Sequence, residues 1–182
     1  MTGTTAAPDR QPVLTGDLVS LRPTRAADWD ALFAVASDPL LWEVHPAHDR
    51  WREPVFRTFF DAGLASGGML TIHDRASGAV IGSSRYDNWR PEADEIEIGW
   101  TFIARASWGG AVNREVKALM LGHIHRQVET VIFQVGEDNV RSRRAMEKIG
   151  GRLRPGRETR MMAGLLRDHV AYEIRRGEGP AA

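Results

Sequence analysis

The sequence contains no cysteine among its 182 residues. Disulfide bonds, thiolate nucleophiles and cysteine-ligated metal centres are therefore excluded. Also missing are an uncharged apolar run near the ~18 residues that a transmembrane helix needs and the basic and apolar regions of a secretory signal. These absences lead us to expect a cytoplasmic protein.

The net charge is zero, because 24 basic and 24 acidic side chains cancel. This balance argues against a general binder of nucleic acid or membrane surfaces, so we expect neither as a partner. The charges are nevertheless unevenly distributed. Residues 1–100 carry 15 acidic and 9 basic side chains, a difference of −6, and residues 101–182 carry 9 acidic and 15 basic ones, a difference of +6.

The residues that are present describe one globular domain, since 42% are apolar and 26% are charged. We expect the domain to cover residues 13–176, between a flexible arm over residues 1–12 and a flexible tail over residues 177–182. Apolar periodicity predicts strands over residues 18–22, 69–73, 80–89, 95–103, 131–135, 153–161 and 169–174, and helices over residues 26–36, 52–64, 112–127 and 139–149. This order predicts an α/β fold around a single mixed sheet.

Alternation in the strand over residues 95–103 places Glu95 and Glu97 on one face and a second set of residues on the other, namely Ile96, Ile98, Trp100 and Phe102. Acids in the middle of a strand need water or a partner. Two interpretations stay open: a solvated face, or a carboxylate that binds a cation and relays its proton.

A Gly109-Gly110-Ala111 loop joins that strand to the next helix. Small residues let a ligand approach the backbone, and a helix N-terminus offers unpaired N–H groups and a positive dipole end. The pattern is compatible with a phosphate site, while a plain helix start with flexible glycines is the simpler interpretation of the loop alone. Asn139 and Ser142 open the following helix, where ordinary N-capping is the simpler interpretation.

Histidine spacing gives no support for a metal centre. His123 and His125 do not share a helical face, His45 and His48 lie without a third ligand nearby, and no H-E-x-x-H motif occurs. We therefore expect no metal.

Four segments in order carry a family resemblance: Glu97-Ile-Gly-Trp100, Trp108-Gly-Gly-Ala111, residues 139–150 (NVRSRRAMEKIG) and Arg167-Asp-His-Val-Ala-Tyr172. Together they resemble the GNAT-superfamily N-acetyltransferases, of the Rim-type branch that acts on ribosomal proteins and small amines. The resemblance covers about residues 14–175. It implies the acyl-CoA N-acyltransferase fold: a mixed, mostly antiparallel sheet of about six or seven strands flanked by about four helices.

The resemblance implies acetyl-CoA as cosubstrate and no metal. The cofactor-binding residues would be Phe102, Ile103, Trp108, Gly109, Gly110, Ala111, Val112, Asn113, Asn139, Arg143 and Arg144. Backbone N–H groups of the loop would hold the pyrophosphate, and Arg143 and Arg144 the ribose phosphate. The loop departs from the family pattern at Ala106, where Gln or Arg is usual.

The resemblance also implies direct attack of a primary amine on the thioester in a ternary complex. Many members have a tyrosine that protonates the leaving thiolate, but Met146 occupies that position here. Ser142 is the replacement that the Rim-type branch implies. Glu97 matches the position of the base, and Glu158 is a second candidate.

The family places its acceptor loop at residues 40–50, which Trp42 and Trp51 flank. We expect these two tryptophans and Glu95 to bind the acceptor. A first half with an excess of acid would suit a cationic amine, and a basic second half would suit the polyanionic cofactor. The alternatives are a catalytically weak acyl-CoA-binding or regulatory domain and an acyltransferase for longer chains. Dimers are common in the family, so a homodimer is also an expectation.

Overall fold

The computed structural model describes residues 6–179. Its strands are β1 (Leu14–Thr15), β2 (Val19–Pro23), β3 (Met69–Asp74), β4 (Val80–Arg90), β5 (Glu95–Ile103), β6 (Thr130–Gly136), β7 (Arg152–Leu153), β8 (Glu158–Met162) and β9 (Leu165–Arg175). Its α-helices are α1 (Trp29–Ala36), α2 (Glu53–Ser66), α3 (Ala111–Ile124) and α4 (Val140–Lys148). None of the helices in this part of the chain is long and apolar enough to cross a membrane.

The strands form one sheet in the order β1-β2-β3-β4-β5-β6-β9-β7, with β8 paired to the other end of β9. All pairs are antiparallel except β5 with β6. The predicted mixed sheet is confirmed, with nine strands in the described residues instead of six or seven. One reason is that the single strand expected over residues 153–161 is interrupted after Leu153, where Pro155 and Gly156 break the pattern.

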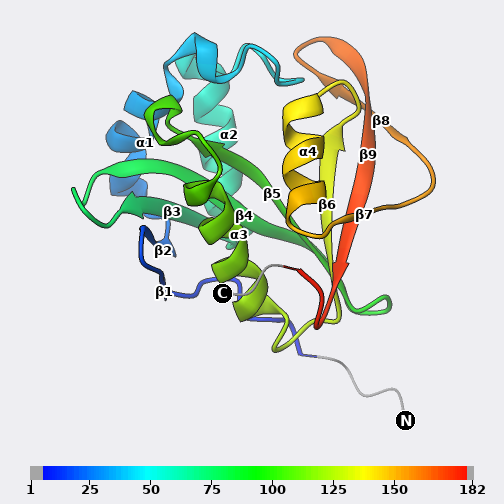
Figure 1. Cartoon of the computed structure of the whole chain (residues 1–182). Coiled ribbons are helices and arrows are strands. Elements are labelled where there is room, and N and C mark those ends of the chain that lie inside the picture. The colour runs from blue at the N-terminus through cyan, green and yellow to red at the C-terminus, as the bar shows by residue number, and fades with distance from the viewer. Residues whose placement is uncertain (1–5, 180–182) are drawn as a thin grey trace.

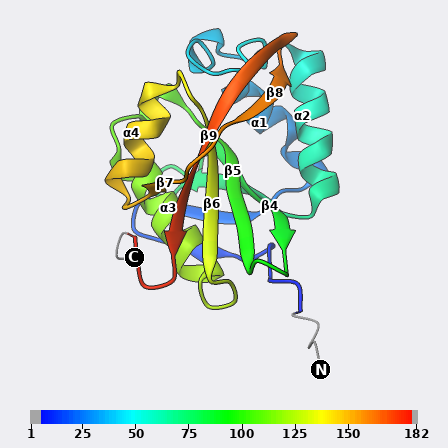
Figure 2. The same cartoon turned by 90° about the vertical axis from the view of Figure 1, so that its right-hand side faces the viewer.

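Helices cover both faces of this sheet (Figures 1 and 2). The apolar faces of α3 and α4 pack on one side, where Met120 and Met146 join the larger cluster of buried residues. On the other side α1 and α2 bury Leu32, Phe56 and Phe60 in a second, aromatic-rich cluster. The spacing of apolar residues in the sequence predicts which face of each helix is buried, because residues three and four apart lie on the same side of a helix.

A bulge in β5 corrects the predicted strand faces. Ser83 of β4 pairs with Phe102, but Arg85 pairs with Gly99, so one residue is inserted in β5 between them. Trp100 lies in the bulge with φ of 52°. The inserted residue reverses the alternation. Phe102 therefore packs with the α1 and α2 cluster instead of with the isoleucines of the opposite face.

Part of each predicted terminal arm contacts the domain. The amide of Asp9 donates to Gln127 Oε1 over 2.8 Å, and Pro8 and Pro12 are buried. At the other end Glu178 forms an ion pair with Arg152 at 2.9 Å. The division into a domain over residues 13–176 and two flexible terminal arms stays a prediction. Residues 1–5 and 180–182 of the expected arms lie outside the described residues.

Candidate active site

The parallel strands β5 and β6 pair over three residues each. Glu95–Glu97 face Thr130–Ile132, and beyond these β5 pairs with β4 and β6 with β9. Residues 98–103 of β5 and 133–136 of β6 therefore each pair on their outer side only. On the sides that face each other, they have no strand partner among residues 6–179. An open edge of this kind can accept an extended chain as an additional strand. Phe102 and Ile103 lie on the open part of β5, where the pantetheine arm is expected to pair.

The loop before α3 has the features of an anion site. Gly109 and Gly110 have φ of 122° and 102°, and a Cβ at either position would meet nothing within 4 Å. The N-terminus of the 14-residue α3 follows directly, with no acid in its first turn. Its unpaired N–H groups therefore face a space that glycine leaves open. The backbone of the loop, from Trp108 to Asn113, fits a pyrophosphate group.

Asn139 and Ser142 open α4 as the sequence indicated. The buried Asn139 is the N-cap, and its Oδ1 accepts a hydrogen bond from the Ser142 amide at 3.1 Å. Capping therefore accounts for one end of the Asn139 side chain. The Ser142 hydroxyl is half-buried and has no hydrogen-bond partner in the described part of the chain. It remains free to donate a proton to a ligand.

The arginines of α4 divide into different roles. Arg143 donates from Nε to the Tyr172 hydroxyl at 3.2 Å and from Nη1 to the Glu137 carbonyl at 3.3 Å. These contacts hold Arg143 against β9, so the geometry favours a structural role over the predicted phosphate contact. Arg144 is exposed. Its phosphate contact stays a prediction.

Arg141 is the arginine that the sequence analysis did not select. Its guanidinium carbon lies 4.1 Å from the centroid of the Trp108 ring, so it reaches from α4 to the glycine loop. Trp108 is itself held by a hydrogen bond from its Nε1 to the Ile103 carbonyl at 2.9 Å. The sequence shows three arginines in α4, at positions 141, 143 and 144, and gives no means of choosing one of them over another.

Glu97 lies on the sheet face opposite the isoleucines, as predicted. Its side chain is buried, with the residue 7% exposed, and Oε2 accepts a hydrogen bond from Asn88 Nδ2 at 2.7 Å. Burial raises the pKa of Glu97, while the bond from Asn88 partly opposes the rise. A carboxyl with a raised pKa retains a proton more readily and is a stronger base when ionised.

Glu158, the second candidate base, is in a different environment. It is exposed and forms an ion pair with Arg160 at 2.9 Å, and this contact lowers the pKa of Glu158. A carboxylate of lowered pKa is a weaker proton acceptor. Glu97 is therefore the better candidate of the two.

The three predicted acceptor residues have other contacts. Trp42 is buried and donates from Nε1 to the Ala36 carbonyl at 2.7 Å. Trp51 is partly exposed and stacks with Arg52. Glu95 binds Arg90 at 2.5 Å with one oxygen and Arg154 with the other. These contacts favour structural roles, and acceptor binding by the three stays a prediction.

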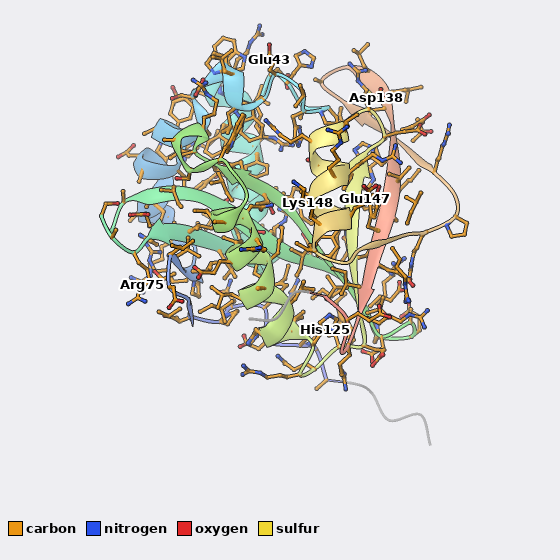
Figure 3. All side chains as sticks on the ribbon, viewed as in Figure 1. Glu43, Arg75, His125, Asp138, Glu147 and Lys148 are labelled. Atoms are coloured by element: carbon orange, nitrogen blue, oxygen red, sulfur yellow. The ribbon has the colours of Figure 1, made fainter. Side chains whose placement is uncertain are left out.

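Residues 42–52, which we call the link, reach the carboxyl end of β6. Pro46 Cγ lies 2.6 Å from where a Cβ on Gly136 would be, so glycine at position 136 permits this approach. Glu43 of the link and Asp138 of the loop before α4 lie at the same end of the molecule (Figure 3). The link thus lies near the start of α4 and overlaps residues 40–50, and acceptor binding by this segment stays a prediction.

A cavity of ≈ 500 Å³ opens beside the link, against the bulge of β5. Residues from five segments line it, among them Arg50, Phe59, Arg85, Trp100 and Met161. The sequence analysis missed these residues. No local pattern connects them, because the link, α2, β4, β5 and β8 meet only in the fold.

The sequence profile of the family described as acetyltransferase (GNAT) domain matches residues 19–152. The chain therefore belongs to the GNAT acetyltransferase family and is an acyltransferase that uses acetyl-CoA as donor. The open edge of β5 and the glycine loop fit that donor. Within the described residues no group of three His, Asp or Glu side chains is placed to hold a metal ion.

Solved structures share the fold. A GCN5-related N-acetyltransferase from Brucella melitensis superposes with a TM-score of 0.80 at 23% identity, over 97% of this chain and 84% of that one. RimJ from Mycobacterium smegmatis, in complex with CoA-disulfide, superposes with a TM-score of 0.68 at 22% identity, over 91% of this chain and 85% of that one. Spermidine N-acetyltransferase from Vibrio cholerae, in complex with CoA and spermine, superposes with a TM-score of 0.70 at 13% identity, over 90% of this chain and 98% of that one. A search of curated protein sequences found no match.

Proposed function

We propose that this protein is an N-acetyltransferase that transfers acetyl from acetyl-CoA to a primary amine by direct attack in a ternary complex. The absence of cysteine supports direct transfer, because the most reactive nucleophile for an acyl-enzyme is missing. Placement in the Rim-type branch, the cytoplasm as location and a homodimer belong to the same proposal. The likeness to RimJ supports the branch.

Glu97 is the proposed base. The amine arrives as an ammonium ion and must lose a proton before its nitrogen can attack. Glu97 lies just before the bulge, and its Oε1 is 3.4 Å from the position of a Cβ on Gly99. The buried carboxylate with its raised pKa is the single observation that carries this assignment.

Ser142 is the proposed acid for the departing thiolate. Met146, at the position of the family's tyrosine, is buried in the core and has no proton to donate. The Ser142 hydroxyl is free of hydrogen bonds within residues 6–179 and lies in the first turn of α4. A hydroxyl near a positive helix end can also stabilise the thiolate charge.

The test is a thiol-release assay with acetyl-CoA and a panel of primary amines that includes peptide N-termini, amino acids, polyamines and simple alkylamines. Release of free CoA with at least one amine, reduced at least tenfold in Glu97→Gln, supports the proposal. Binding of acetyl-CoA without release for any amine would support the alternative of a binding domain. Faster release from longer acyl-CoA would favour the longer-chain enzyme.

Donor binding is measured separately by thermal shift. A ligand at about 100 times its dissociation constant adds about 2.7 kcal/mol to the free energy of unfolding. The absence of any shift with acetyl-CoA at millimolar concentration would contradict the proposed donor site. The Gly110→Val variant is expected to lose the shift, because Gly110 has φ of 102°, which a β-branched residue rarely adopts.

A further inference from the structure

Arg50 is a cation without an acidic partner. Its guanidinium carbon lies 5.1 Å from the ring centroid of Trp42 and 4.5 Å from that of Phe59. No hydrogen bond or ion pair from the described residues reaches the guanidinium. Burial lowers the pKa of Arg50 to about 10, and the neighbouring Asp49 only partly opposes this.

Several other half-buried arginines in this fold are paired, although Arg167, whose buried Nε has no hydrogen-bond partner in the described part of the chain, is not. Arg22 binds both oxygens of Asp28, at 2.7 and 2.8 Å. Arg154 binds Glu173 at 2.5 Å and also contacts Glu95. Such pairs exist because a charge removed from water is unfavourable unless an opposite charge replaces the lost hydration. The half-buried Arg50 has no acidic partner of this kind among the described residues, and it is one of the residues that line the cavity.

Arg85 brings a second positive charge to the same cavity. Its guanidinium carbon lies 3.8 Å from the centroid of the Trp100 ring. Its Nε is 3.2 Å from Asp87 Oδ2, an ionic contact whose angle is not that of a hydrogen bond. The charge of Arg85 contributes to the lowered pKa of Arg50, so the two cations repel each other across the space.

The walls of the cavity are otherwise mostly apolar. Phe59, Trp100, Met161 and Met162 line it, and Asp49 is the one acid among the described lining residues. A volume of ≈ 500 Å³ is that of a small-molecule site. The cavity is widely open to the surface and combines mostly apolar walls with two arginines, one of which has no acidic partner among the described residues.

We propose that the acceptor is a primary amine that also carries a carboxylate, and that Arg50, assisted by Arg85, binds this carboxylate. Guanidinium groups bind carboxylates through paired, charge-assisted hydrogen bonds. The amine end of the acceptor would lie toward Glu97, whose charge also acts on Arg85. This inference rests on the proposed function and deepens it by naming the acceptor class.

The proposed acceptor adds a carboxylate to the cationic amine that is expected from the sequence. That expectation came from the excess of acid in residues 1–100, which counts every acid alike. The cavity is lined by only one acid and by two arginines from that same half of the chain. Local charge, and not the sum over the sequence, determines which ligand a site attracts.

The catalytic test compares matched acceptors. All twenty amino acids are assayed, and each active one is compared with its amide and its decarboxylated amine, for example leucine with leucinamide and isoamylamine. An amidated peptide beginning Leu-Glu is compared with one beginning Leu-Gln, which separates a side-chain carboxylate on a peptide from that of a free amino acid. We expect the carboxylate-bearing member to have a kcat/KM at least tenfold higher. A best acceptor without a carboxylate would overturn the inference while leaving the proposed function intact.

Arg50→Gln should raise KM for the carboxylate-bearing acceptor by about 10- to 100-fold, as expected for a lost charged hydrogen bond, with a smaller effect on kcat. Arg50→Lys should restore part of the loss. Arg57→Gln is the matched control, since Arg57 also lies on an aromatic ring, 3.2 Å from the centroid of Trp29, but does not line the cavity. Equal KM values in Arg50→Gln and Arg57→Gln would contradict the proposal.

A binding measurement remains informative if no amine is acetylated. Hexanoate should quench tryptophan fluorescence saturably in the wild type and weakly in Arg50→Gln, whereas hexylamine should have no such effect. Far-UV circular dichroism checks that each variant is folded. Absence of saturable hexanoate binding up to 50 mM (about 2 kcal/mol of affinity) would overturn the carboxylate site, whatever the outcome of the thiol-release assay.

Discussion

The guanidinium group of Arg141 lies on the indole ring of Trp108, with 4.1 Å between the guanidinium carbon and the ring centroid. This contact joins α4 to the loop before α3 on either side of the point where β5 and β6 stop pairing. Because Trp108 also donates to the Ile103 carbonyl, the loop is held from both β5 and α4. The expected pyrophosphate site is thereby fixed in place with a positive charge beside it.

Arg141→Gln should weaken acetyl-CoA binding about 3- to 10-fold, because it removes a cation next to a polyanionic ligand. The loss should shrink as salt concentration rises, since salt screens the charge. Isothermal titration at two ionic strengths measures both effects. Arg126→Gln, an exposed change just beyond the other end of α3, is the control and should leave the dissociation constant unchanged. Equal affinities for the two variants would remove Arg141 from the site.

Ser142→Ala should lower kcat about 10- to 100-fold with little change in acetyl-CoA affinity, as expected for loss of a general acid. The helix cap should survive, because Asn139 accepts its hydrogen bond from the backbone amide of residue 142 and not from the side chain. Steady-state kinetics and thermal unfolding test the two statements. Ser107→Ala, in the turn before the glycine loop, serves as the control. A normal kcat in Ser142→Ala would exclude the hydroxyl as the acid.

Glu97→Gln should lower kcat about 100-fold or more, whereas Glu158→Gln should have a small effect. In the wild type, kcat/KM should fall as pH drops through the raised pKa of Glu97, because protonation removes the base. That acidic limb should lie above the ordinary pKa of a glutamate and should be absent from the residual activity of Glu97→Gln. An unchanged limb in this variant would assign it to another group.

The raised pKa of Glu97 also makes the free energy of unfolding depend on pH. The folded state holds the proton of Glu97 at pH values where the unfolded chain has released it, so the free energy of unfolding falls as pH rises through this interval. Glu97→Gln should therefore be more stable than the wild type at pH 8 and closer to it at pH 4. Urea unfolding at the two pH values measures the difference.

Lys117 should make the free energy of unfolding depend on pH in the opposite direction. It is buried on α3, donates to Thr101 Oγ1 at 2.6 Å, and burial lowers its pKa from 10.5 to about 7. Between these values the unfolded chain binds the additional proton, so this residue makes the free energy of unfolding rise with pH, by at most about 1.4 kcal/mol per pH unit. Lys117→Met should flatten the rise and be no less stable than the wild type at pH 7.

The control for this prediction is Lys148→Met, because Lys148 is exposed at the end of α4 (Figure 3). Urea unfolding between pH 6.5 and 9.5 should show the wild-type slope in this variant. If Lys117→Met retains that slope as well, the dependence belongs to other titrating groups.

Much of the fold was predictable because its information is local. Apolar spacing located α2, which spans Glu53–Ser66 against an expected 52–64, and β3, β4 and β5 within two residues. The strand expected over residues 153–161 was wrong because Pro155 and Gly156 divide it, and β1 is too short to show a period. The face of Phe102 was wrong because periodicity assumes an uninterrupted ladder, and the bulge at Trp100 adds one residue.

The site was predictable in part for the same reason. Gly109, Gly110 and Asn139 occupy their places because a loop and a helix cap are short-range features. Contacts between distant segments were not predictable: Arg143 is turned to Tyr172, and Glu95 is held by Arg90 and Arg154. The sequence shows that these arginines exist but not which acid or ring each one meets.

The sequence by itself determined the order of helices and strands, the glycine loop at a helix start and the family. These depend on spacings within one segment and on motifs in a fixed order. Only the tertiary structure decided that Glu97 is buried while Glu158 is ion-paired, and that Arg50 and Arg85 share a cavity. The physical reason is that burial and charge pairing depend on neighbours in space, which for these residues are far away along the chain.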